Sequence, residues 1–273
     1  MHSNDPDEVF RRMNAFTKDG HLFKEKAEDM REQVKLANTP YQFPTVEGKS
    51  KVGIIWTSIA DVPDGSTIMF PGFGNPGMPR NLIQALYNQG AKNLVGISNS
   101  VGRNLGMLVE NGRIRKMIAA FTASTHPSRE TPFNRMYNDG EVEAELVPQG
   151  TLVERMRAAA AGIGAFYTPT SVGTELAEGK EHREFDGRMH VLEYPLHGDY
   201  AFIRCWRADT FGNLQFRLAQ RNFNPIMAMA AKVTIVEVEH EIVEVGEIDP
   251  DHVHVPGVYT NRIVQIPPDG IFD

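Results

Sequence analysis

The sequence predicts an α/β fold in which helices flank a largely parallel β-sheet. After residue 48, short β-branched and aromatic runs alternate with helical patterns, which is typical of parallel sheets joined by helical crossovers. The chain has 273 residues, of which 41% are hydrophobic, enough to bury one large core. We therefore predict an N-terminal helical extension with its connector over residues 1–48 and an α/β domain over residues 49–273.

The predicted extension differs in composition from the rest of the chain. Residues 7–37 are rich in Glu, Lys, Arg, Met and Ala with scattered apolar positions, which predicts one or two helices broken near Asp19-Gly20. A Pro- and Gly-containing connector follows, NTPYQFPTVEGKSK. The extension carries no catalytic motif, and we expect it to pack on its own domain or on a partner chain.

The elements of the α/β domain follow from local patterns. Strands are predicted at residues 67–70, 93–97, 114–121 and 143–147, with a hairpin inside 201–217 and a β-rich stretch over 232–245. Helices are predicted from Pro79 to Gly90, over 132–138, over 151–162 and after Asn224-Pro225, which would supply the N-cap and first-turn proline.

A glycine loop, PGFGNPGMP, joins the first of these strands to its helix. Gly72, Gly74 and Gly77 form G-x-G-x-x-G, and glycines permit positive φ and a close approach of backbone N–H groups to an anion or carbonyl oxygen. A dinucleotide-binding unit would carry an Asp or Glu roughly 20 residues further on. The next strand instead ends in Ser98-Asn99-Ser100, which argues against NAD. The loop alone fits either ligand binding or a tight turn.

Gln149 lies between a predicted strand and a predicted helix. Thr151 and Glu154 fit a Thr-x-x-Glu capping box that would open this helix. Open α/β sheets bind ligands at the carboxyl ends of their strands. A glutamine amide there can donate a hydrogen bond to an oxygen that develops negative charge, or it can satisfy backbone groups of the turn.

Composition narrows the functional class. The formal net charge of -7 argues against sequence-independent nucleic-acid binding, and no apolar run reaches membrane-spanning length. Cys205 is the single cysteine, so we expect a cytoplasmic protein without an internal disulfide, in which Cys205 is a small buried residue. His252 and His254 have a spacing that would suit a metal, but we expect ordinary strand positions and predict no metal site.

Five sequence blocks, in order, resemble the α subunit of the family I CoA-transferases. They are DVPDGSTIMFPGFGNPGMPRNLIQAL, ELVPQGTLVERMR, AGIGAFYTPTSVGTELAEGKEHREFDG, RNFNPIMAMAA and DPDHVHVPGVYTNRIV. The resemblance implies ping-pong transfer of CoA between two carboxylic acids through a glutamyl-CoA thioester. It also implies a 3-oxoacid such as acetoacetate as acceptor, succinyl-CoA or acetyl-CoA as donor, and no cofactor beyond these substrates.

The resemblance implies a role for each matched residue. Gln149 matches the oxyanion donor, Asn99 lies in the matching SNxxG segment near the acyl group, and Asn224 lies in a segment close to the active site. The residues that match the CoA- and substrate-binding glycine loop are Pro71, Gly72, Phe73, Gly74, Asn75, Pro76 and Gly77.

In this family the catalytic glutamate belongs to a β subunit, within a Glu-Asn-Gly setting. The resemblance therefore implies a partner β subunit, with the two chains in an α2β2 assembly. Glu110-Asn111-Gly112 has the same residue types, but we predict that it ends a helix. The stretch 119–125, AAFTAST, departs from the family pattern near the expected acyl pocket, so the acid pair stays open. Two alternatives remain: an acyl-CoA thioester hydrolase of the same fold and a non-catalytic metabolite-binding subunit.

Overall fold

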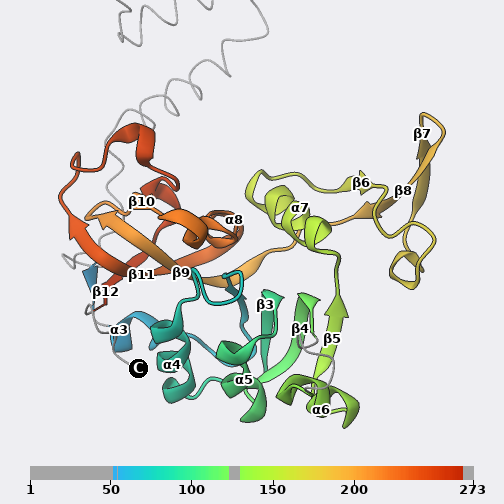
Figure 1. Ribbon diagram of the computed structural model, residues 1–273, viewed down its shortest axis with the longest axis horizontal. Coiled ribbons are helices and arrows are strands. Elements are labelled where there is room, and N and C mark those ends of the chain that lie inside the picture. The colour runs from blue at the N-terminus through green and yellow to red at the C-terminus, as the bar shows by residue number, and fades with distance from the viewer. Residues whose placement is uncertain (1–51, 54, 123–129, 267–273) are drawn as a thin grey trace, which may run out of the picture. The chain divides into compact units, whose positions relative to one another are not determined.

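The computed structural model describes residues 52–53, 55–122 and 130–266 (Figure 1). The predicted helical extension over 1–48 lies outside the described residues. The α-helices are α3 (Ile55–Ile59), α4 (Arg80–Gln89), α5 (Arg103–Glu110), α6 (Pro132–Asn138), α7 (Gln149–Ala160) and α8 (Asn224–Ala230). Short 3-10 helices are η1 (Glu175–Ala177), η2 (Leu218–Arg221), η3 (Pro250–His252) and η4 (Gly257–Tyr259).

The main sheet is largely parallel, as predicted. Its strands are β1 (Val52–Gly53), β2 (Thr67–Phe70), β3 (Leu94–Ser100), β4 (Ile114–Phe121), β5 (Glu143–Leu146), β9 (Gly198–Asp209), β10 (Leu214–Gln215), β11 (Ala231–Val243) and β12 (Arg262–Gln265). They are ordered β1-β12-β11-β9-β2-β3-β4-β5, with every neighbouring pair parallel, and β10 adds to β9 as the antiparallel arm of the predicted hairpin.

Helices cover both faces of this sheet. Side chains of α3, α4, α5 and α6 form one buried cluster with one face, and side chains of α7 and α8 form a second cluster with the other. Strand residues alternate between the clusters: Phe70 and Phe202 pack edge to face in the first, whereas Met69 and Ile203 belong to the second. Burial on both sides explains why these strands read as nearly continuous apolar runs.

A small antiparallel sheet is inserted between α7 and β9. Its strands β6 (Phe166–Thr168), β8 (Arg188–Glu193) and β7 (His182–Phe185) pair in that order and lie at the right of Figure 1. At the end of β8, Glu193 is buried, and its carboxylate pairs with Lys180 at 2.5 Å and faces Arg155 of α7 at 4.0 Å. These charges join the small sheet to α7.

Several local predictions are confirmed. Gly90 ends α4 in the left-handed conformation with φ 101°, and the predicted strand over 114–121 is β4. The second strand is longer than predicted: β3 continues through Ser100, so Asn99 lies on the strand and not after it. Its backbone keeps pairing with β4 as far as Phe121, and this pairing extends the strand.

Candidate active site

The glycine loop follows β2 and leads into α4. Gly72, Gly74 and Gly77 have φ values of 109°, 68° and 73°, so all three adopt the positive φ that the sequence predicts. The Phe73 N–H donates to the Pro76 carbonyl oxygen at 3.3 Å, which folds the middle of the loop into a tight turn. The Phe73 ring is exposed on the surface.

Two asparagines beside α8 hold the loop. Asn222 accepts a hydrogen bond from the Gly72 N–H at 3.1 Å and donates to the Pro76 carbonyl oxygen at 2.9 Å. Asn224 donates to the Gly77 carbonyl oxygen at 3.0 Å. A Cβ on Gly77 would lie 2.5 Å from Asn224 Nδ2 and 2.6 Å from the Gln220 carbonyl oxygen, so this position accepts only glycine without rearrangement.

The polar atoms of Asn224 are all engaged within the protein. Its Oδ1 accepts from the Arg204 N–H at 2.9 Å, and its Nδ2 also donates to the Gln220 carbonyl oxygen at 2.9 Å. The side chain is fully buried and does not cap α8, so the predicted N-cap role is wrong. A direct contact between Asn224 and a ligand would require one of these bonds to break.

Gln149 and Asn99 meet although they are far apart in the sequence. Gln149 is the first residue of α7, and its Nε2 donates to Asn99 Oδ1 at 2.7 Å. Asn99 is buried near the carboxyl end of β3, on the face that α7 covers. The contact fixes the orientation of the glutamine amide at the N-terminus of a helix, where backbone N–H groups lack intrahelical partners.

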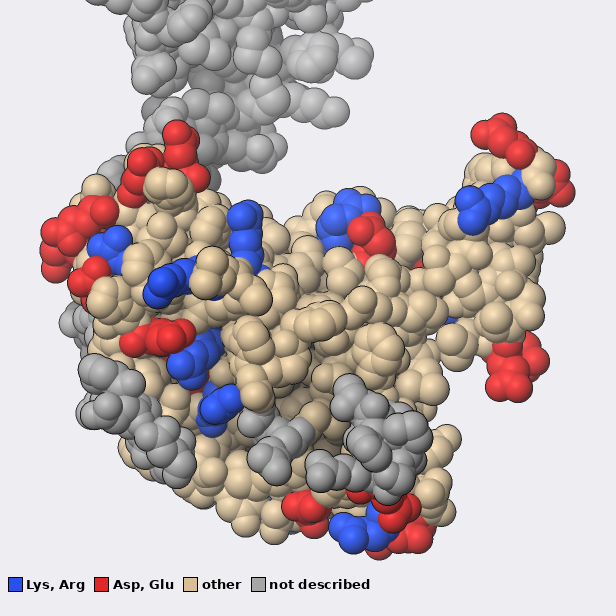
Figure 2. Space-filling view, viewed as in Figure 1, with Lys and Arg blue, Asp and Glu red and all other residues tan. Residues whose placement is uncertain are grey.

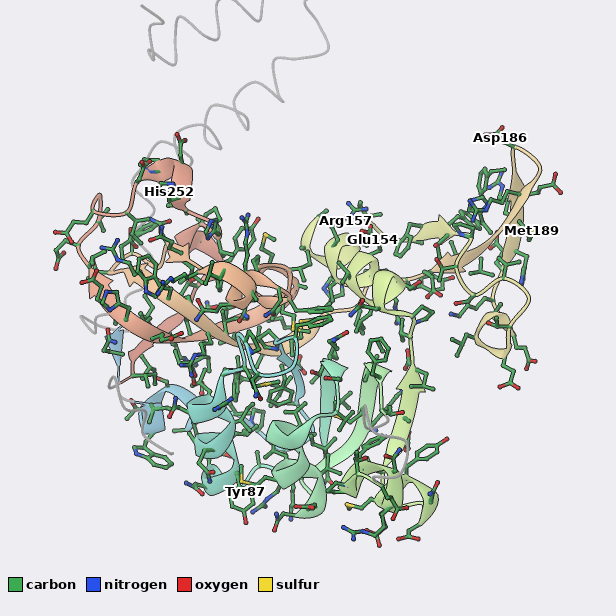
Figure 3. All side chains as sticks on the ribbon, in the orientation of Figure 1. Tyr87, Glu154, Arg157, Asp186, Met189 and His252 are labelled. Atoms are coloured by element: carbon green, nitrogen blue, oxygen red, sulfur yellow. The ribbon has the colours of Figure 1, made fainter. Side chains whose placement is uncertain are left out.

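The predicted capping box at this helix is wrong. The helix begins at Gln149 after the N-cap Pro148, two residues earlier than predicted, and has no side-chain cap. Thr151 consequently lies within the first turn, and its buried hydroxyl has no hydrogen-bond partner among the described residues. Glu154 pairs instead with Arg157, whose Nε donates to Oε2 at 2.6 Å, and Figure 3 shows the two side chains together on α7.

The glycine loop and the Gln149–Asn99 pair lie at the same edge of the sheet. Ser98 of β3 is paired with Phe70 of β2, so Asn99 continues its strand beside the point where Pro71 begins the loop. Neighbouring strands are about 4.8 Å apart, which makes the loop and the pair neighbours. This edge is the one at which open α/β sheets bind ligands. The structure thus groups Gln149, Asn99 and the loop.

A cavity of about 860 Å³ opens on the other side of the loop. It is lined by Asn75, Pro76, Gly77, Met78, Arg80, Arg204, Trp206, Arg217, Leu218, Ala219, Gln220, Glu239 and His240. Figure 2 shows basic side chains gathered on the left of the face, over the region of α4, β9 and β11. The rings of Trp206 and His240 stack with centroids 5.5 Å apart. Gln149 and Asn99 do not line this cavity.

Glu237 is a buried carboxylate that the sequence patterns did not single out. It lies on β11, and burial raises its pKa to about 7 against the lowering effect of Arg204. Arg204 Nη1 donates to Glu237 Oε1 at 3.0 Å, and the Leu82 N–H of α4 donates to Oε2 at 3.0 Å. The signal in the sequence was a carboxylate inside the apolar run TIVEV, in phase with the buried Ile235.

Glu110 lies away from this site. It ends α5, and Gly112 adopts φ 63°, which confirms the predicted helix end. The helix starts beyond the carboxyl end of β3 and returns to the start of β4, whose eight residues span about 25 Å. Glu110 therefore lies at the opposite edge of the sheet from Gln149 and cannot act as a nucleophile beside it.

The remaining candidates are structural. Cys205 is buried, and burial raises the pKa of its thiol well above the usual value, so it does not present a thiolate. His252 ends η3, labelled in Figure 3, and is not on a strand as predicted. Within the described ranges, no group of three His, Cys, Asp or Glu side chains could hold a metal ion. No helix in that same part of the chain is long and apolar enough to cross a membrane.

Comparisons with known proteins agree on one family. The family model described as Coenzyme A transferase matches residues 55–265. The chain is 52% identical over 206 residues to the α chain of the probable succinyl-CoA:3-ketoacid coenzyme A transferase of Bacillus subtilis, covering 74% of this chain and 84% of that relative. It is 48% identical over 215 residues to the α chain of the 3-oxoadipate CoA-transferase of Pseudomonas putida, covering 78% and 91%.

The fold comparison points the same way. The structure of glutaconate coenzyme A-transferase from Acidaminococcus fermentans matches with a TM-score of 0.71 at 24% identity, covering 80% of this chain and 76% of that one. At this identity the match supports the fold alone. The family model and the relatives together cover most of the α/β domain. The chain belongs to the coenzyme A transferase family and corresponds to its α subunit.

Proposed function

We propose that this chain is the α subunit of a transferase that moves CoA between carboxylic acids, with a 3-oxoacid such as acetoacetate as acceptor and succinyl-CoA or acetyl-CoA as donor. The contact between Gln149 Nε2 and Asn99 Oδ1 at 2.7 Å carries the proposal. It presents an oriented amide donor at the ligand-binding edge of the sheet, beside the glycine loop. Relatives named for 3-ketoacid and 3-oxoadipate substrates support the acid class.

The reaction proceeds through a glutamate of a partner β subunit. Its carboxylate attacks the carbonyl carbon of the acyl-CoA thioester, and the C–S bond breaks to give an acyl-glutamyl anhydride and a CoA thiolate. The thiolate then attacks the glutamyl carbonyl, releases the first acid as its carboxylate and leaves a glutamyl-CoA thioester. The acceptor acid reverses these two steps. Each addition places negative charge on a carbonyl oxygen, and no net proton transfer is needed.

Gln149 donates a hydrogen bond to that oxygen. An amide NH₂ group has two hydrogens, so donation to Asn99 leaves the second for the substrate. Asn99 is buried and holds the amide in place, which avoids a reorganisation cost when the charge develops. The partner supplies the nucleophile because the Glu110 carboxylate lies at the opposite edge of the sheet.

The test replaces Gln149 with alanine in the complex of this chain with its β subunit. We expect kcat to fall by about 100- to 1000-fold with little change in KM for acyl-CoA, because the interaction forms in the transition state. Gln84→Ala is the matched control, since Gln84 donates its amide to Asn88 on the exposed surface of α4. Unchanged turnover of Gln149→Ala in an intact complex would refute the oxyanion role and favour a non-catalytic binding subunit.

A thioester hydrolase on the same fold is the second candidate, and product analysis separates the two. A transferase forms acceptor acyl-CoA and releases little free CoA without an acceptor, whereas a hydrolase releases CoA steadily under both conditions. The proposal includes an α2β2 assembly, a cytoplasmic location and no cofactor beyond CoA and acyl-CoA as substrates. Part of the stretch 119–125 that departs from the family pattern lies outside the described residues, so substrate profiling must define the acid pair.

A further inference from the structure

Glu237 lies in the middle of the sheet beneath the glycine loop. Its side chain is fully buried on the face of β11 that packs against α4. A buried carboxylate loses its hydration, and this loss is tolerated only when donors replace the water. The donors that Glu237 uses therefore indicate what the residue holds in place.

The first set of donors belongs to the start of α4. The Leu82 N–H donates to Glu237 Oε2 at 3.0 Å, and Asn81 Nδ2 donates to Oε1 at 3.4 Å. Leu82 is the third residue of α4, so its N–H is one of those without an acceptor inside the helix. The carboxylate also lies at the positive end of the helix dipole. Since α4 directly follows the glycine loop, Glu237 fixes the point where the loop ends.

The second donor is Arg204 of β9. Its Nη1 donates to Glu237 Oε1 at 3.0 Å, and its side chain borders the cavity beside the loop. The backbone N–H of Arg204 donates to Asn224 Oδ1 at 2.9 Å, and Asn224 Nδ2 donates to the Gly77 carbonyl oxygen at 3.0 Å. Glu237 thus reaches the loop by two routes, one through α4 and one through Arg204 and Asn224.

We propose that Glu237 is a positioning residue, whose buried carboxylate fixes the glycine loop by holding the N-terminus of α4 on one side and Arg204 on the other. Its catalytic consequence rests on the proposed function, whereas its effect on the loop does not. No other carboxylate in the described residues accepts from both the start of α4 and Arg204. Glu239 contacts Arg204 from the surface at 3.4 Å, and its other hydrogen bond comes from Gln220 of η2 at 2.8 Å.

Hydrogen exchange of the full chain tests the loop directly. We expect Glu237→Gln to raise amide exchange in residues 71–90 by about tenfold or more, with smaller changes in α5 and α7. Glu241→Gln is the matched control, because Glu241 lies on the same strand and pairs with Arg207 of β9 at 2.8 Å on the exposed side. This control should leave exchange in residues 71–90 unchanged.

Glu237→Asp covers the case in which the glutamine variant does not fold. The shorter side chain keeps the charge but cannot span both sets of donors, so we expect the same local increase, of smaller size. Exchange in residues 71–90 equal to that of the wild type, or an increase spread evenly over the chain, would overturn the proposal. This readout needs no activity, so it stays decisive if the complex fails to transfer CoA.

Kinetics of the complex with the β subunit then test the consequence. A displaced loop weakens ground-state and transition-state binding together, so we expect KM for acyl-CoA to rise by about tenfold with a smaller fall in kcat. That pattern is the reverse of the one expected for Gln149→Ala. A change in kcat alone would contradict a role exerted through the loop.

Discussion

Gly77 offers the sharpest stability test because a neighbouring glycine provides its own control. Both Gly77 and Gly74 have positive φ, 73° and 68°, so alanine at either site adopts a disfavoured backbone conformation at a cost of about 1 kcal/mol. At Gly74 an added Cβ meets nothing within 4 Å. At Gly77 it would lie 2.5 Å from Asn224 Nδ2 and 2.6 Å from the Gln220 carbonyl oxygen.

Neither of those two atoms is free to move. Asn224 is fully buried and bonded to Gln220 and Arg204, so relief of the overlap must shift backbone. Overpacking of this kind costs about 1–3 kcal/mol. We therefore expect Gly77→Ala to lower the free energy of unfolding by about 3 kcal/mol and Gly74→Ala by about 1 kcal/mol.

The assay is urea unfolding of the full chain followed by far-ultraviolet circular dichroism. The midpoints of the two variants are compared at equal slope, because a change of slope would mean that the unfolded or folded state had changed. Equal losses for the two variants would refute the tight clamp of Asn224 and Gln220 around Gly77. A loss for Gly77→Ala within about 0.5 kcal/mol of zero, the usual surface effect, would refute it equally.

Three further predictions concern pH and a buried turn. Burial lowers the pKa of His254, whose Nδ1 accepts from the Phe216 N–H at 2.9 Å. The folded state therefore binds fewer protons than the unfolded state, and stability should fall as the pH drops below about 6.5, a loss that His254→Gln should abolish in urea titrations. Burial raises the pKa of Glu237 to about 7, so the folded state holds the extra proton and stability should fall as the pH rises from 4.5 to about 7. The slope is at most about 1.4 kcal/mol per pH unit, and a Glu237→Gln variant that keeps this slope would contradict the assignment. Asp209 is buried and accepts from three backbone N–H groups at 2.9–3.1 Å and from Asn213 Nδ2 at 2.7 Å, so Asp209→Ala should cost on the order of 3 kcal/mol in thermal unfolding, and a loss below about 1 kcal/mol would contradict its anchoring role.

Local patterns predicted the loop well because its conformation is set by its own residues. The positive φ values of Gly72, Gly74 and Gly77 follow from the absence of a Cβ. The left-handed end of α4 at Gly90 follows for the same reason. The parallel sheet followed from alternating strand and helix patterns, which reflect burial on both faces.

The contacts between distant segments could not be predicted in this way. The meeting of Gln149 with Asn99 depends on the order of β3, β4 and β5 in the sheet, which no local pattern states. The buried carboxylate of Glu237 is one of several in the run EVEHEIVE, and only its donors on α4 distinguish it. The capping box failed because Pro148 starts α7 earlier and leaves Thr151 inside the helix.

The central claim is that this chain supplies the oxyanion donor while a partner chain carries the covalent intermediate. The most direct measurement is intact-protein mass spectrometry of the purified complex after incubation with succinyl-CoA in the absence of an acceptor acid. We expect the mass of bound CoA on the partner chain and none on this one, with loss of the adduct when acetoacetate is added. An adduct on this chain, or no adduct on either chain in a complex that transfers CoA, would contradict the account.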